Sequence, residues 1–234
     1  MGAELGVMLH SLDVSENDFE PRAERPTWGA DDLRTFIKGA AEDELGPLWL
    51  LLSTTGMRRG EELGLKWSDI ELDTGRVTIR RTLSYVGTVP TLTEPKTASS
   101  RRLVTVPAET VAALKAQRVG QAEVRLIMGG GYSDEGFVFA GAAGDPLKPA
   151  TVSRAFGRLV ARLGLPKLTV HGLRHTWVTV ALGSGVPAKV ASEVLGHSSI
   201  AITMDTYSHA LPGMQEAATQ AVGGPPLWLS VENR

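Results

Sequence analysis

Three β-like runs lie in the middle of this 234-residue chain, with helical patterning before and after them. The runs cover residues 76–83, 88–93 and 101–106, and turn-forming sequences flank them, so they predict a small antiparallel meander. Apolar periodicity predicts helices over residues 30–40, 46–55, 59–65, 107–127, 151–163, 172–184, 187–195, 199–207 and 213–221. We therefore predict a mostly α-helical α+β fold with a small three-stranded antiparallel sheet.

The composition excludes several classes of protein. The chain has no cysteine, which rules out disulfides, thiolate metal sites and thiol nucleophiles. It has no apolar run of the length that spans a membrane, and its first residues lack a basic start followed by an apolar stretch. We therefore expect a cytoplasmic protein that is not bound to a membrane.

The net charge of −2 hides an uneven distribution along the chain. Residues 1–24 contain six acidic residues and one arginine, whereas residues 95–174 contain twelve Lys/Arg and five Asp/Glu. The local field, rather than the total charge, decides whether a polyanion is attracted. A nucleic-acid partner is therefore compatible with the middle of the chain, although arginine-rich helices can also be simple solvated faces.

The sequence His171-Gly172-Leu173-Arg174-His175 is the first candidate site. On a helix His171 and Arg174 share one side, and a guanidinium beside an imidazole suits a phosphate group. His171 and His175 also have the spacing of a zinc-binding helix, but the glutamate of that motif is absent. A zinc site is therefore the weaker alternative.

Two further candidates lie earlier in the chain. Arg58 follows a glycine break after an apolar helix, where it could also form a simple ion pair with Glu61 or Glu62. Lys96 lies in the turn between the second and third β-like runs, where an exposed lysine is ordinary.

The last candidates follow the helix at 187–195. Gly196 is predicted to end this helix and leaves His197 at its C-terminus, where a cation is favourable in any protein. Tyr207 follows ten residues later, and a lone tyrosine is more often packed than reactive. Individually these signals are weak, but their order along the chain is specific.

In this order the motifs resemble the catalytic domain of the tyrosine recombinases, and most of all the phage-type integrases. The resemblance covers residues 27–214 and rests on four segments: TGMRRGEELGLKW (55–67), EPKTASSRR (94–102), HGLRH (171–175) and LGHSSIAITMDTYSH (195–209). It implies a catalytic set consisting of Arg58, Lys96, His171, Arg174, His197 and Tyr207, with Glu61 supporting Arg58.

The resemblance implies that Tyr207 attacks a DNA phosphate, which gives a 3′-phosphotyrosyl bond and a free 5′-hydroxyl. The arginines and His197 would stabilise the phosphorane, His171 would help Tyr207 lose its proton, and Lys96 would protonate the leaving oxygen. It implies no cofactor, metal or ATP. The expected partner is double-stranded DNA. The chain is expected to form a homo-tetramer on DNA and to be a monomer in isolation.

The chain departs from the family pattern at its ends. Integrases carry a helical core-binding domain before the catalytic domain, whereas residues 1–26 are an acidic stretch that we interpret as a tail or truncated linker. We therefore expect weak DNA affinity. Residues 215–234 form a C-terminal tail that either docks on a neighbouring protomer or folds back on its own domain.

Other functions remain open at this stage. A type IB topoisomerase and a resolvase-like chromosome-dimer recombinase would use the same chemistry. A truncated or non-catalytic DNA-binding remnant of an integrase would keep the fold alone, and a zinc hydrolase built on His171 and His175 is the remote alternative.

Overall fold

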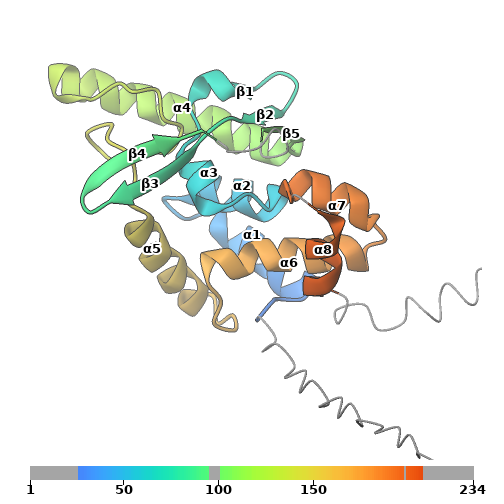
Figure 1. The fold of residues 1–234 in the computed structure, drawn as a ribbon. Coiled ribbons are helices and arrows are strands. Elements are labelled where there is room, and N and C mark those ends of the chain that lie inside the picture. The colour runs from blue at the N-terminus through green and yellow to red at the C-terminus, as the bar shows by residue number, and fades with distance from the viewer. Residues whose placement is uncertain (1–25, 95–100, 198, 208–234) are drawn as a thin grey trace, which may run out of the picture.

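The computed structural model of the chain describes residues 26–94, 101–197 and 199–207, and most of this part is helical (Figure 1). The α-helices are α1 (Ala30–Ala40), α2 (Gly46–Thr55), α3 (Arg59–Leu63), α4 (Ala108–Met128), α5 (Pro149–Arg162), α6 (Val170–Gly183), α7 (Ala188–Leu195) and α8 (Ile200–Tyr207). Two short 3-10 helices are η1 (Trp67–Asp69) and η3 (Gly129–Gly131). Among these residues, no helix combines the length and apolar character needed to cross a bilayer.

The strands form two small antiparallel sheets. In the first, β2 (Arg76–Ile79) lies between β1 (Ile70–Glu71) and β5 (Arg102–Thr105), and Val77 pairs with Ile70 on one side and Val104 on the other. The second sheet is a hairpin of β3 (Thr82–Val86) and β4 (Val89–Thr93). The prediction of a mostly helical α+β fold with a small three-stranded antiparallel sheet is thus confirmed.

The expected meander is wrong in its strand order. The run at 76–83 is two strands, because the chain leaves the first sheet at Arg80 and Arg81 and the next strand pairs with β4 instead. Arg81 Nη1 lies 2.6 Å from an oxygen of the buried Asp69 carboxylate, and this ion pair fixes the point at which the chain turns. The third strand of the sheet is β1, which no β-like run predicted.

Most of the predicted helices are confirmed to within about two residues at each end, and the one expected at 59–65 ends at Leu63. The helix at 213–221 lies outside the described residues.

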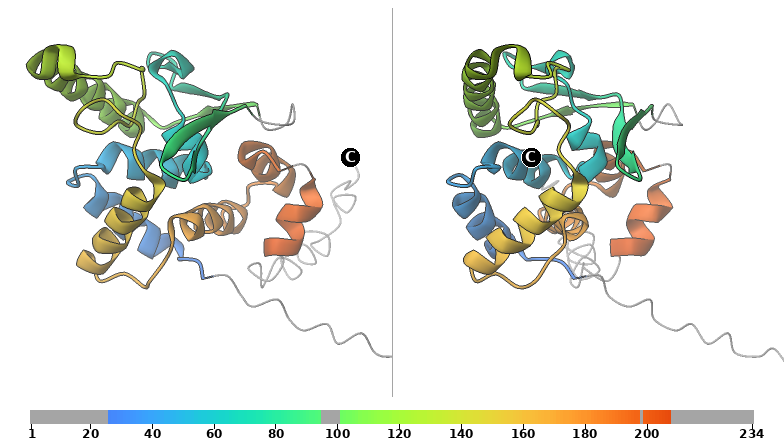
Figure 2. Two further views of the ribbon diagram at one scale, coloured as in Figure 1. Left: turned by 60° about the vertical axis from the view of Figure 1, so that its left-hand side comes forward. Right: turned by 90° about the vertical axis from the view of Figure 1, so that its left-hand side faces the viewer.

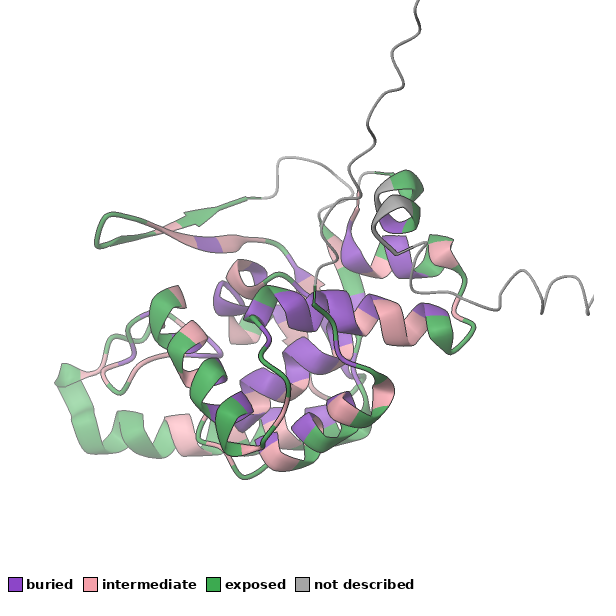
Figure 3. Ribbon diagram, turned by 90° about the horizontal axis from the view of Figure 1, so that it is seen from below, coloured by how far each residue is buried: buried purple, intermediate pink, exposed green. Residues whose placement is uncertain are grey.

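A cluster of four aromatic rings fixes the helical half of the molecule. Phe156 of α5 contacts Phe36 of α1 and Trp49 of α2, with ring centroids 5.3 and 5.6 Å apart. Trp28, just before α1, closes the cluster against Phe36 at 5.2 Å. These rings are almost fully buried and belong to the interior that Figure 3 colours purple. Such clusters contribute packing energy beyond the area they bury, so α1, α2 and α5 form a rigid base.

A smaller apolar cluster holds the C-terminal helices of the described part. Val178 and Leu182 of α6 pack with Ala191 and Leu195 of α7, and all four are buried. Helix α8 packs against α7 in turn, and the two lie side by side in both views of Figure 2. The end of α7 is therefore held in place relative to α6.

Candidate active site

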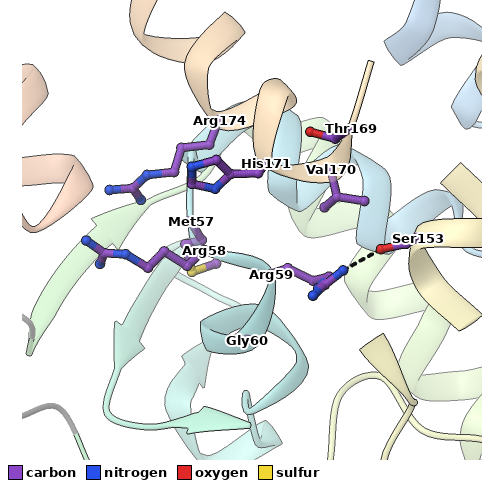
Figure 4. Close-up of a pocket in the computed structure, with 9 residues that line it drawn as sticks. All are labelled: Met57, Arg58, Arg59, Gly60, Ser153, Thr169, Val170, His171 and Arg174. Carbon is purple, nitrogen blue, oxygen red and sulfur yellow. Dashed lines mark hydrogen bonds between the residues drawn. The ribbon is translucent and has the colours of Figure 1, made fainter. Parts of the chain in front are cut away.

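A cavity of about 520 Å³ opens where the N-terminal ends of α3 and α6 meet α5. The residues that line it are Met57, Arg58, Arg59, Gly60, Ser153, Thr169, Val170, His171 and Arg174 (Figure 4). Figure 4 shows the guanidinium groups of Arg58 and Arg174 extending to the same side, with the imidazole of His171 beside Arg174. Arg59 points the opposite way and donates a hydrogen bond to the Ser153 hydroxyl.

Arg58 is positioned by the end of one helix and the start of the next. Gly56 ends α2 with a φ of +59°, a left-handed conformation that glycine adopts without strain, and Arg58 then starts α3 in an extended conformation. The Glu61 carboxylate accepts hydrogen bonds from the backbone N–H and from Nη1 of Arg58, both 2.9 Å long. The predicted ion pair of Arg58 with Glu61 is present. Because the Arg58 side chain stays 43% exposed, the same residue also faces the cavity.

Glu61 is a buried carboxylate that stays ionised. Burial alone would raise its pKa, but the hydrogen bonds and charge of Arg102, followed by the backbone N–H and charge of Arg58, outweigh this effect and lower the pKa below its usual value. Glu61 therefore carries a negative charge between two arginines.

Helix α6 delivers the two residues of the HxxR motif. Its N-terminus is capped by Thr169, whose hydroxyl accepts a hydrogen bond of 2.9 Å from the backbone N–H of Gly172. His171 is exposed, and Arg174 is buried, with 4% of its surface accessible. Arg174 donates to the carbonyl oxygens of Gly56 at 2.6 Å and Leu195 at 2.9 Å, which fixes its guanidinium at the edge of the cavity.

The alternative zinc pair, His171 and His175, makes an edge-to-face ring contact at 4.6 Å. Within the described ranges, no three His, Cys, Asp or Glu side chains gather as a metal-binding group would require.

His197 lies at the end of α7, next to these arginines. Gly196 ends the helix with a φ of +65°, and the backbone N–H of His197 bonds back to the Ser192 carbonyl. Its Nδ1 is 2.8 Å from the hydroxyl oxygen of Thr203, a fully buried residue of α8. Burial, together with the positive charges of Arg174, Arg58 and Arg102, lowers the pKa of His197 to about 4 despite the opposing charge of Glu61. The imidazole of the DNA-free protein is therefore neutral near pH 7.

Two predicted site residues are described less fully. Tyr207 is the last residue of α8, one helical turn after Thr203, and its side chain is outside the described part. Lys96 lies outside the described residues, between the end of β4 and the start of β5. The cavity thus brings together Arg58, His171 and Arg174, and the charges of the arginines reach His197.

Sequence reasoning missed Arg102. Its guanidinium binds Glu61 and the carbonyl oxygen of Val194, so it touches two of the segments that carry predicted site residues. A signal was present, because strand alternation places residue 102 on the same side as the apolar Val104 and Val106, whereas Arg101 and Leu103 face the other way. An arginine on the apolar side of a strand indicates a buried ion pair.

The chain is similar to known proteins over most of its length. The model of the phage integrase family matches residues 34–213. A XerC-like tyrosine recombinase from Caldanaerobacter subterraneus subsp. tengcongensis is 31% identical over 208 residues, which cover 84% of this chain and 53% of the relative. The ICEBs1 integrase of Bacillus subtilis is 25% identical, over 81% of this chain and 52% of the relative. The chain spans about half the length of these curated relatives.

Solved structures of recombinases share the fold. The XerA recombinase superposes with a TM-score of 0.66 and 25% identity, covering 88% of this chain and 67% of that one. The Tn1549 transposon integrase, solved in complex with transposon right end DNA, has a TM-score of 0.72 and 24% identity, covering 91% of this chain and 70% of that one. The resemblance drawn from the four motifs is confirmed, and this chain belongs to the phage integrase family of tyrosine recombinases.

Proposed function

We propose that the chain is the catalytic domain of a site-specific DNA recombinase that cleaves and rejoins double-stranded DNA through Tyr207. The observation that carries the proposal is the cavity in which Arg58, His171 and Arg174 come together from two helices. Two guanidinium groups on one side of a cavity suit the bidentate recognition of a phosphate. The Tn1549 integrase and the XerH recombinase, which share this fold, were solved in complex with DNA, which supports a DNA partner.

In the proposed reaction, the phenolic oxygen of Tyr207 attacks the phosphorus atom and displaces the 5′ oxygen of the next nucleotide. The proton of Tyr207 goes to His171, and the leaving oxygen takes a proton from Lys96. Arg58, Arg174 and His197 stabilise the negative charge that develops on the phosphorane. Because the phosphotyrosyl bond replaces the phosphodiester bond one for one, a 5′-hydroxyl reverses the step without ATP. We assign no cofactor and no metal to the reaction.

The assembly is also part of the proposal. We infer that the active form is a homo-tetramer on DNA, that the isolated chain is a monomer, and that residues 215–234 dock on the neighbouring protomer. We place the protein in the cytoplasm. We divide the chain into an acidic tail or linker at residues 1–26, the catalytic domain at residues 27–214 and the C-terminal tail.

The test is a trapping experiment with the full chain. The protein is incubated with EDTA and a pool of nicked duplexes of randomised sequence, and covalent protein–DNA adducts are separated by denaturing electrophoresis. We expect an adduct with the wild type and with the control Tyr85→Phe, whose hydroxyl bonds to the Pro146 carbonyl in a loop. We expect none with Tyr207→Phe.

Three outcomes would contradict the proposal. An adduct that persists in Tyr207→Phe rules out this nucleophile, and an adduct that EDTA abolishes rules out the metal-free reaction. DNA binding without an adduct on any duplex would identify a non-catalytic DNA-binding module.

A further inference from the structure

Arg102 connects two parts of the candidate active site that are distant in the sequence. It is the first residue of β5, and its side chain is 7% exposed. Nη1 and Nη2 donate to the two oxygens of the Glu61 carboxylate at 3.1 and 2.8 Å, a bidentate pair. Nε donates to the carbonyl oxygen of Val194 at 2.5 Å. One guanidinium group therefore holds the supporting carboxylate of Arg58 and the last turn of α7 at the same time.

Arg102 also packs against the turn that carries His197. A Cβ atom built on Gly196 would lie 2.9 Å from Nη1 of Arg102 and 3.1 Å from its Cδ. A contact of 2.9 Å is closer than Cβ atoms normally make, so a side chain at residue 196 would displace the guanidinium of Arg102, and glycine leaves room for it. Because His197 directly follows Gly196, the packing of Arg102 against this turn also positions the backbone that carries the His197 side chain.

The contacts form a continuous path through the site. Arg58 binds Glu61, Glu61 binds Arg102, and Arg102 binds Val194 at the end of α7. Arg174 makes a second link, because it joins the carbonyl oxygens of Gly56 and Leu195. The two final carbonyl groups of α7 thus receive hydrogen bonds from two different arginines, and the negative end of the helix dipole favours both cations there.

Arg102 itself is placed to act through its neighbours. Its side chain is only 7% exposed, and three of its hydrogen bonds go to protein groups, so its donors are engaged within the protein. We infer that Arg102 is a positioning residue that sets Arg58 and His197 at a fixed separation, so that both contact the same phosphate oxygen atoms. This inference rests on the proposed DNA cleavage.

The electrostatics agree with this role. The groups that face His197 are the guanidiniums of Arg174, Arg58 and Arg102, the Glu61 carboxylate and the Thr203 hydroxyl. After burial, the three positive charges lower the pKa of His197, and that of Arg102 is one of them. Replacing Arg102 with a neutral residue therefore raises the pKa of His197, whether or not DNA is present.

The test compares Arg102→Met and Arg102→Lys with the control Arg125→Met. Arg125 is an exposed arginine of helix α4 that pairs with Asp134. Three quantities are measured on the full chain: the single-turnover rate of adduct formation on a trapping duplex, the affinity for an uncut duplex at several salt concentrations, and the pKa of His197 by NMR without DNA. We expect Arg102→Met to cut DNA about 10²-fold more slowly, because a small misplacement of reacting groups causes a rate loss of this size. Its DNA affinity stays unchanged, and the pKa of His197 rises.

Arg102→Lys is the decisive variant, because it keeps the charge and preserves a fold that Arg102→Met could lose. A lysine is a point charge that cannot hold a carboxylate in a bidentate manner and a carbonyl group at once. We expect a low His197 pKa as in the wild type, but a cutting rate below the wild-type rate. The control keeps the wild-type rate.

A wild-type rate in Arg102→Lys would overturn the inference, since charge alone would then suffice. A parallel loss of DNA affinity in Arg102→Met, with a salt slope reduced by about one, would also overturn it, because Arg102 would then contact a phosphate directly. Failure of the wild type to form any adduct counts instead against the proposed function. If the wild type forms the adduct and both Arg102 variants form it at the wild-type rate, only this inference is contradicted.

Discussion

Arg174 Nη1 donates a hydrogen bond of 2.6 Å to the carbonyl oxygen of Gly56, a residue 118 positions earlier in the chain. Gly56 closes α2 in a left-handed conformation, so its carbonyl group is set by the buried core of that helix. The bond goes to a backbone carbonyl, and it therefore orients the guanidinium without neutralising its charge. The core of the fold thus aims a cation at the cavity before any ligand arrives.

The first prediction concerns this orientation. Arg174→Lys keeps the charge but cannot reach the Gly56 and Leu195 carbonyls together, since an ammonium lacks the planar fork of a guanidinium. We expect adduct formation to slow by about 10²–10³-fold, the usual loss for one donor to a developing oxyanion. Single-turnover trapping measures the rate, and Arg125→Lys on the surface of α4 is the matched control. A rate within about twofold of the wild type would show that charge alone is needed.

The second prediction concerns the hydrogen bond between His197 and Thr203. Thr203→Val has nearly the same volume but leaves Nδ1 of His197 without this partner, at a cost of about 1–3 kcal/mol. We expect slower adduct formation in Thr203→Val and recovery in Thr203→Ser, which restores the hydroxyl. Because His197 is neutral near pH 7, the loss should be the same at pH 6.5 and 8. Equal rates in the valine and serine variants would show that the hydroxyl plays no part.

The third prediction concerns Glu62, which is fully buried beside the ionised Glu61. Neither of its carboxylate oxygens makes a hydrogen bond of good geometry among the described residues. Burial therefore raises its pKa well above the usual value of 4.5, and the nearby backbone of Leu52 opposes this only weakly. The folded protein therefore keeps a proton that the unfolded chain releases above about pH 4.5, so this group makes stability fall as the pH rises from there toward the folded pKa.

Glu62→Leu removes this penalty and should raise the free energy of unfolding at pH 8 by about 1–3 kcal/mol. Urea denaturation between pH 5 and 8 measures the difference, which should grow with pH. Glu61→Gln is the contrasting variant. Because the pKa of Glu61 is lowered, its ionised form contributes stability above the unfolded pKa, and this contribution is lost as the pH falls. If Glu62→Leu is less stable than the wild type throughout this range, the carboxyl group has a favourable partner.

The fourth prediction concerns Lys96 as the proton donor to the leaving oxygen. Lys96→Ala should slow cleavage of an ordinary phosphodiester, because the 5′ oxygen then leaves as an alkoxide. A substrate with sulfur in place of that oxygen has a leaving group that needs no proton, so it should restore the rate. Arg174→Lys on the same substrate should stay slow. If the sulfur substrate fails to rescue Lys96→Ala, Lys96 has another role.

The sequence predicted the helices well because their apolar periodicity and glycine stops are local signals. The end of α2 at Gly56 and of α7 at Gly196 are examples, and both glycines have a positive φ. The sheet was predicted less well, because the pairing of β2 with β5 depends on contacts across an intervening hairpin. The break at Arg81 is set by its ion pair with Asp69, twelve residues away, and no local pattern contains that information.

The candidate site, like the fold, could be predicted from the sequence only where the signals are local. Its motif residues could be named from residue type and order, and the predicted pair of Arg58 with Glu61 lies within one helical turn. The link from Arg102 to Val194 spans 92 residues, so it required the folded chain. The lowered pKa of His197 also arises from burial in the folded chain and from charges contributed by three separate segments.

The contact between Arg102 and Val194 can form only late in translation, because the two residues lie 92 positions apart. A ribosome adds roughly 5–20 residues per second, so several seconds pass between the synthesis of Arg102 and that of Val194. During that time a nascent chain can form the pair of Arg102 with Glu61, but it has neither the end of α7 nor His197. An unfinished polypeptide therefore lacks the assembled candidate site, and Tyr207, the proposed nucleophile, is added later still.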